Sequence, residues 1–276
     1  MNNTPSYPES PEPAEGASQG TPQPQPFGGA QDRPVSVAFP ESAPYVTYAI
    51  IGVTVAFYLL QNISPYIWGY PLTFTNNIDW LEYYGARINE GIIDGELWRL
   101  FTPALLHGSI THILFNMYAL FSLGTGLEQY FGRWRFFALY VLGAFAGNVA
   151  SFLFTDGYSV GASTAIFGLL GAEGVFLYQN RKLLGKQARK AINNIVFVAA
   201  FNLFIIGSLP YIDNWGHIGG LVGGLMFTWF AGPIWAIEGI QPYLQLADKR
   251  SSREAITGAA LVLIVFGGLA MWGMVR

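Results

Sequence analysis

The chain has 276 residues, and 52% of them are hydrophobic. Only 11% are charged, against roughly 25% in a typical soluble domain, so the composition excludes an ordinary soluble protein and indicates a membrane protein. The net charge of −3 argues against a nucleic-acid partner. The chain has no cysteine, which excludes disulfides, thiolate metal ligands and a cysteine nucleophile. Any histidine-dependent chemistry must use His107, His112 or His217.

Residues 1–42 are rich in proline, glycine, serine, glutamate and glutamine and have almost no large apolar side chains. Such a segment cannot bury enough apolar surface to offset its ordering entropy, so we expect a disordered cytoplasmic tail. We do not expect it to act as a signal peptide, because it has neither a basic start nor an early apolar run.

Seven apolar runs follow the tail, each close to the roughly 20 residues that a helix needs to cross a bilayer. They indicate an all-α, polytopic membrane protein. The expected runs lie near 44–61, 110–127, 135–154, 163–180, 192–209, 217–236 and 256–275.

The basic residues predict the orientation of these helices. With the N-terminus in the cytoplasm, eleven lysines and arginines fall on the inner side and three on the outer side, in agreement with the positive-inside rule. The three outer ones are Arg87, Arg99 and Arg276. The C-terminus is then outside, and Ser163 begins the fourth helix from its outer end.

The first outer loop, residues 62–109, is expected to be long and to lie partly in the outer leaflet, because it is rich in interfacial aromatics. These aromatics are Tyr66, Trp68, Tyr70, Trp80, Tyr83, Tyr84 and Trp98.

In the stretch 161–168, the small residues Gly161 and Ala162 lead into Ser163, and an apolar run of helix length follows it. A serine in the first turn of a helix lies beside unpaired backbone N–H groups and the positive end of the helix dipole. These groups stabilise the oxyanion that forms when a serine attacks an acyl group. Alternatively, Ser163 only caps the helix and the glycines only provide packing surface.

Four polar residues fall at one level in the outer half of the membrane: His112, Asn116, Ser163 and His217. Polar groups at this depth are costly and usually face a wet cavity, so we expect a single pocket. His217 is the expected base, and His112 and Asn116 are expected oxyanion donors beside the Ser163 N–H. Small residues should let the two helices approach closely; they are Gly219, Gly220, Gly223, Gly224, Gly168 and Ala172.

Other interpretations of the polar residues remain open at this point. A path for an ion or solute competes with catalysis, whereas a zinc site fits the spacing poorly because no His-Glu-x-x-His pattern occurs. Asp213 and Asn214 precede His217 and could orient its ring, but a helix N-cap or a hydrated turn is favoured for Asp213. We therefore expect a Ser163–His217 dyad without a third member.

Taken together, five motifs in order resemble the rhomboid family of intramembrane serine proteases, over about residues 44–236. These are Trp98-Arg99, His107-x-x-x-x-His112-x-x-x-Asn116, Gly124-x-x-x-Glu128-x-x-x-Gly132, Gly161-Ala162-Ser163 and His217-x-x-Gly220-x-x-x-Gly224. Each motif is weak alone, but five in the right order are specific.

The resemblance implies a six-helix catalytic core, 43–237, followed by a linker and a seventh transmembrane helix, 238–276. It implies that Ser163 and His217 act as a catalytic dyad, with an oxyanion hole from His112, Asn116 and the Ser163 backbone. The implied substrates are single-span or multi-span membrane proteins, cut near the outer leaflet of a plasma (inner) membrane. Partners would be these substrates and the lipid bilayer, with no nucleic acid, cofactor or metal.

The chain departs from the family pattern at two positions next to the nucleophile. Thr164 stands where glycine is frequent, and Phe167 stands where some members carry a tyrosine that packs on the base. Phenylalanine can still stack on His217.

Two rival functions remain. The first is an inactive relative that escorts membrane proteins, but both reactive residues are present. The second is a transporter, but no paired interrupted helices are evident.

Overall fold

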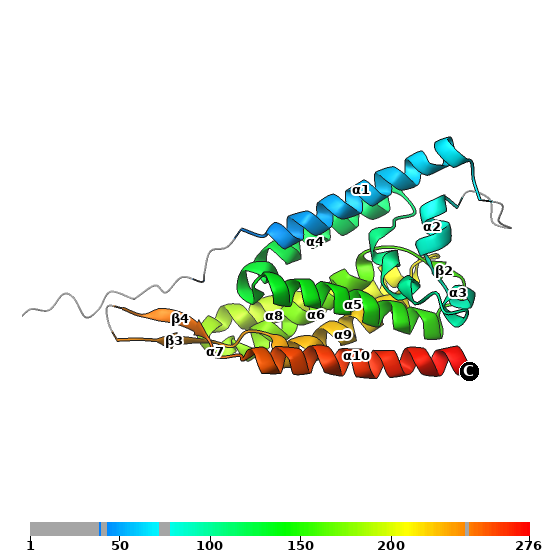
Figure 1. Ribbon diagram of the computed structural model, residues 1–276. Coiled ribbons are helices and arrows are strands. Elements are labelled where there is room, and N and C mark those ends of the chain that lie inside the picture. Colours follow the sequence, from blue (N-terminus) through cyan, green and yellow to red (C-terminus); the bar gives the residue numbers. More distant parts are fainter. Residues whose placement is uncertain (1–38, 40–42, 72–77, 241–242) are drawn as a thin grey trace, which may run out of the picture. The chain divides into compact units, whose positions relative to one another are not determined.

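A computed structural model describes residue 39 and the ranges 43–71, 78–240 and 243–276. Long helices dominate this part of the chain, and one of them overlaps each of the seven predicted apolar runs (Figure 1). They are α1 (Tyr45–Trp68), α4 (Ile110–Phe131), α5 (Arg133–Phe154), α6 (Ser163–Gln179), α8 (Lys186–Phe204), α9 (Asn214–Ala231) and α10 (Ser252–Val275). The predicted all-α membrane fold is therefore confirmed. Two helices end earlier than predicted: the helix of the run 192–209 ends at Phe204, and that of the run 217–236 ends at Ala231, just before Pro233.

Within the described residues, five helices are long and apolar enough to span a membrane: α1, α4, α5, α8 and α10. Helix α6 has 17 residues and most of them are buried, and α9 has 18 residues and four glycines between positions 219 and 224. These two helices pack most extensively against each other and against α5. The count of seven spanning helices stays a prediction.

The glycines of α9 allow two neighbouring helices to approach its backbone closely. A Cβ on Gly220 would lie 2.0 Å from the Thr164 carbonyl oxygen of α6, and a Cβ on Gly224 would lie 2.0 Å from that of Gly168. On the α5 side, a Cβ on Gly219 would lie 2.4 Å from the Ala150 side chain. The predicted close contact between the Ser163 helix and the His217 helix is confirmed, and α5 closes the other side of α9.

The remaining long helices pack around this centre. Glu128 of α4 accepts hydrogen bonds from the backbone N–H groups of Val46 (2.9 Å) and Thr47 (2.7 Å), and from the Thr47 hydroxyl (2.7 Å). A fully buried carboxylate thus caps the start of α1 and ties it to α4. Helix α10 packs on α9, where Gly258 faces the Phe227 carbonyl.

Two small antiparallel sheets lie outside the helices. Strand β1 (Arg87–Ile88) pairs with β2 (Tyr158–Ser159), and β3 (Trp235–Glu238) pairs with β4 (Gln245–Asp248). The second sheet occupies the segment that the sequence predicts to be only a linker to the seventh helix. The short helices are α2 (Trp80–Gly85), α3 (Asn89–Ile93) and α7 (Arg181–Leu184). Within the described residues, three 3₁₀ turns cover Leu97–Leu100, Thr102–Leu105 and Ile206–Ser208.

The predicted tail, 1–42, lies outside the described residues except for Phe39, whose ring packs edge-on against Tyr130 and Trp235. Nothing therefore tests the prediction of disorder there.

The described parts of the loop 62–109 are held by buried polar contacts. Gln61 donates to Asp79 (3.0 Å) and accepts from the His107 N–H (3.0 Å), which ties the end of α1 to the segment before α4. Burial and the nearby Asp79 carboxylate raise the pKa of Glu82 to about 7, so this side chain changes charge near neutral pH. Arg99 pairs with Glu96 and donates to two backbone carbonyls. The loop is thus a packed structure.

Candidate active site

Ser163 is the first residue of α6, and His217 lies in the first turn of α9. The Nε2 atom of His217 lies 2.9 Å from the Ser163 Oγ, within hydrogen-bond distance. Both helices begin at the same end of the bundle, and the glycine contacts between them fix their separation. A hydroxyl beside an imidazole nitrogen is the arrangement in which a base can remove the proton of a serine nucleophile.

The ring of Phe167 stacks on the imidazole of His217, with centroids 4.3 Å apart and an interplanar angle of 9°. Phe167 lies one turn after Ser163, so a single helix supplies both the hydroxyl and the surface against which the imidazole rests. The expected stacking at this departure from the family pattern is confirmed. The other departure, Thr164, is buried against α9, and its hydroxyl has no hydrogen-bond partner among the described residues.

His112 and Asn116 lie on α4, against the segment that leads into Ser163. A Cβ on Gly161 would be 2.7 Å from the His112 ring and 3.6 Å from the Asn116 amide nitrogen, so this position needs a glycine. Gly161 also has a φ of +130°, which glycine adopts without strain. The buried amide nitrogen of Asn116 has no partner within the described chain, so it is available as a donor. The structure brings these two side chains to the nucleophile segment, as the sequence predicts.

His107 lies outside α4, in the segment just before it, and its ring packs edge-on against that of His112 at 5.0 Å. Burial, with a smaller effect of His112, lowers the pKa of His107 to about 3, so the ring stays neutral. Its Nε2 atom accepts a hydrogen bond from the Ala162 N–H, at 3.4 Å. His107 thus supports the residue before Ser163, a position that sequence spacing alone did not reveal.

Asp213 is the N-cap of α9, and its side chain accepts from the Gly216 N–H at 3.0 Å. It also accepts from the hydroxyls of Ser151 and Thr155 at the end of α5. Burial raises the pKa of the Asp213 carboxyl, but these hydrogen bonds outweigh it and hold the pKa below its usual value.

The interpretation of Asp213 as a cap is confirmed. The Nδ1 atom of His217 has no hydrogen-bond partner in the described part of the chain, so none of those residues orients the ring through a hydrogen bond to this atom. The carboxylate instead joins the helix of His217 to α5.

A cavity of about 660 Å³ opens beside the serine and the imidazole. Its walls come from α4, the segment 155–163 and the start of α9, and the lining includes His112, Tyr158, Ser159, Ser163, Tyr211 and His217. The sequence predicts one pocket for His112, Asn116, Ser163 and His217; three of these residues line this cavity, and Asn116 does not. Asn116 lies deeper, behind Gly161.

Two acidic residues of the helices lie away from this cavity. Glu128 caps α1, as described above. Glu173 of α6 lines a separate cavity of about 300 Å³ between α4, α6 and α8. On α8, Phe197, Phe201 and Phe204 are exposed, whereas Ile195 packs towards α6.

Comparison with known families decides the identity of this fold. The family model of the rhomboid domain matches residues 94–234, about half of the chain, and that range holds Ser163, His217 and the two α4 residues. The chain belongs to the rhomboid family. It is a multi-pass membrane protein of that family, with five or more helices suited to cross a bilayer.

Individual relatives support the same assignment. The rhomboid protease GluP of Bacillus subtilis is 37% identical over 194 residues, which cover 70% of this chain and 36% of GluP. The putative rhomboid protease YdcA of the same organism is 35% identical over 142 residues, or 51% of this chain and 70% of YdcA. RHOMBOID-like protein 9, chloroplastic, of Arabidopsis thaliana is 34% identical over 172 residues, which cover 62% of this chain and 37% of that protein. The chain thus covers little more than a third of GluP and of the Arabidopsis relative.

Proposed function

We propose that this chain is an intramembrane serine endopeptidase that cleaves transmembrane segments of other membrane proteins near the outer leaflet. The observation that carries the proposal is the 2.9 Å separation of Ser163 Oγ and His217 Nε2. Membership of the rhomboid family and the similarity to two proteins named as rhomboid proteases support it.

In the proposed reaction, His217 removes the proton of Ser163 while the serine oxygen attacks the scissile carbonyl. The negative charge on that carbonyl oxygen is stabilised by His112, by the Asn116 amide and by the Ser163 N–H at the start of α6. Asn116 suits this role because its amide nitrogen is buried and has no partner among the described residues. His217 then gives its proton to the leaving amine, and a water molecule hydrolyses the acyl-enzyme.

The substrate class follows from the position of the serine among apolar helices. An intact transmembrane helix hides its carbonyls in its own hydrogen bonds, so the bound segment must unwind before it can react. Segments with glycine, proline or polar residues near the outer leaflet are the expected substrates. They would enter from the bilayer, with α8 as the candidate gate.

The test is co-expression with a tagged single-span membrane protein and detection of the cleaved fragment. We expect wild type to cleave, and we expect Ser163→Ala and His217→Ala to lose cleavage by about 10³-fold or more, because each removes a reacting group.

A serine-directed fluorophosphonate gives a second readout that needs no substrate. Wild type should be labelled and Ser163→Ala should not. Ser159→Ala is the matched control: Ser159 lines the same cavity, but the serine at hydrogen-bond distance from the His217 Nε2 atom is Ser163, so labelling of this variant should persist. Equal labelling of wild type and Ser163→Ala would contradict the proposal and favour a binding role.

A further inference from the structure

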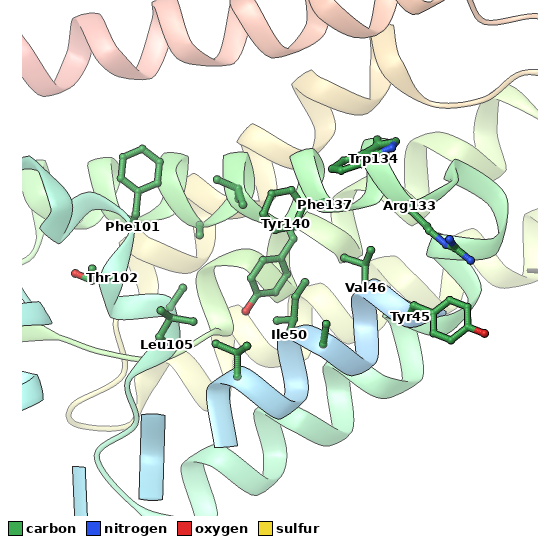
Figure 2. A pocket seen from close by; sticks show the side chains of 15 residues that line it. Tyr45, Val46, Ile50, Phe101, Thr102, Leu105, Arg133, Trp134, Phe137 and Tyr140 are labelled. Atoms are coloured by element: carbon green, nitrogen blue, oxygen red, sulfur yellow. The ribbon is translucent and has the colours of Figure 1, made fainter. Parts of the chain in front are cut away.

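A second cavity, of about 710 Å³, lies between α1, α5 and the segment Phe101–Leu105 (Figure 2). No residue that lines it also lines the Ser163 cavity. We call it the α1–α5 groove. Most of its wall is aliphatic or aromatic, and it is formed by Val46, Ala49, Ile50, Val53, Phe137, Val141 and Ala144 with the residues discussed below. Its occupant therefore needs an apolar part.

Tyr140 makes the wall of the α1–α5 groove polar at one point. The side chain is 5% exposed, and its hydroxyl has no hydrogen-bond partner among the described residues. Figure 2 shows this hydroxyl between Leu105 and Ile50, directed into the groove. A buried donor without a partner costs free energy, so an occupant with a hydrogen-bond acceptor at this depth is favoured.

Arg133 lies at the end of the groove where α5 begins. Its guanidinium stands 4.7 Å from the centre of the Tyr45 ring and forms no ion pair within the described ranges. Arg133 and Tyr140 are seven residues apart, two helical turns, so they share one face of α5. The groove thus has a cation at its rim, a hydroxyl in its wall and an apolar interior.

We propose that the α1–α5 groove binds a bilayer phospholipid. Its phosphate pairs with Arg133, because guanidinium groups bind phosphate strongly. An ester carbonyl accepts from the Tyr140 hydroxyl, and an acyl chain covers the apolar wall. A transmembrane helix of another protein fits less well, because its backbone carbonyls are already hydrogen-bonded and cannot serve Tyr140. A second copy of this chain is disfavoured for the same reason.

The bound lipid would also support the catalytic end of the molecule. One end of the groove is closed by Phe101, Thr102 and Leu105. The carbonyl of Pro103, in the same segment, accepts a hydrogen bond from the Gly161 N–H at 2.9 Å. Just before this segment, the Leu100 carbonyl accepts a hydrogen bond from the Asn148 side chain of α5 (3.1 Å). A lipid in the groove therefore restrains the segment Phe101–Leu105. This segment binds the backbone of Gly161, two residues before Ser163.

The test measures phospholipid binding to the full chain. Protein purified in detergent and stripped of lipid is titrated with dioleoyl phosphatidylglycerol, and the bound lipids are counted by native mass spectrometry. We expect one tightly retained lipid in wild type. Arg133→Gln should weaken retention about tenfold, because it removes a charge-assisted hydrogen bond, and Tyr140→Phe several-fold. Ala49→Trp fills the groove and should abolish this binding.

Matched controls separate the groove from the general lipid surface. Val55→Trp places the same side chain on an exposed position of α1 away from the groove, and Arg253→Gln removes an exposed charge at the start of α10. Both should bind lipid as wild type does. Equal binding by Ala49→Trp and Val55→Trp would overturn the proposal, as would a dimer that only Ala49→Trp dissociates. Arg133→Gln changes an exposed residue, so it tests the site even if Ala49→Trp does not fold.

Discussion

His217 is held by two side chains of α6, on different sides of its ring. Ser163 contacts its Nε2 atom, and Phe167 covers one face at 4.3 Å. The Nδ1 atom has no partner among the described residues, so no carboxylate fixes the ring in the way that a triad would. Stacking on Phe167 is then the main restraint on the angle at which the imidazole meets the hydroxyl.

Phe167→Ala should therefore slow the reaction of Ser163. A stacked aromatic pair contributes about 0.5–1.5 kcal/mol beyond its buried area, so we expect a loss of up to about tenfold in fluorophosphonate labelling rate per folded molecule. Phe167→Tyr keeps the ring and should keep the rate. Phe176→Ala, on the same helix, also removes a buried ring, but one packed on Tyr130. Equal rates for Phe167→Ala and Phe176→Ala would show that the stack has no positioning role.

The sequence predicted the roles of side chains that belong to a local motif. It did not predict the hydrogen-bond partners of side chains whose partners are distant in the sequence. A serine at a helix start and a histidine on a glycine-rich helix are legible as motifs. The partners of Glu128 are the backbone groups of Val46 and Thr47, 82 and 81 residues away, and no spacing rule connects them. The contacts of Asp213 with the end of α5 are hidden in the same way.

Ser163 and His217 can contact each other only because helices α6 and α9 pack closely together. Gly224→Ala places a methyl group 2.0 Å from the Gly168 carbonyl oxygen, so the helices must shift. Overpacking of this kind costs about 1–3 kcal/mol, and we expect a lower unfolding temperature with reduced labelling of Ser163. Gly267→Ala in α10, where no atom lies within 4 Å of the added Cβ, should be neutral or slightly stabilising. Equal unfolding temperatures for the two variants would show that the contact is not tight.

The long helices were predictable because their apolar runs match the thickness of a bilayer. The strands were not, because β1 and β2 have two residues each and form only where the chain brings residues 87 and 159 together. Strands β3 and β4 lie in a segment whose composition reads as a linker. Short elements of this kind depend on tertiary contacts more than on local periodicity.

We expect the charges of the whole molecule to set its orientation, with the Ser163 cavity at the outer leaflet and Arg133 at the inner one. The chain has no cysteine, so single substitutions report topology without background labelling. Asp94→Cys, in the first loop, and Lys182→Cys, in α7, introduce thiols at exposed positions.

A membrane-impermeant maleimide applied to sealed spheroplasts should label Asp94→Cys at once. Lys182→Cys should react only after the membrane is opened, because basic loops stay on the cytoplasmic side. Labelling in detergent shows that both thiols are accessible, and the cysteine-free parent controls for other reactive groups. The reverse pattern would place Ser163 at the inner leaflet and would move the predicted cut sites in substrates to the cytoplasmic end of their helices.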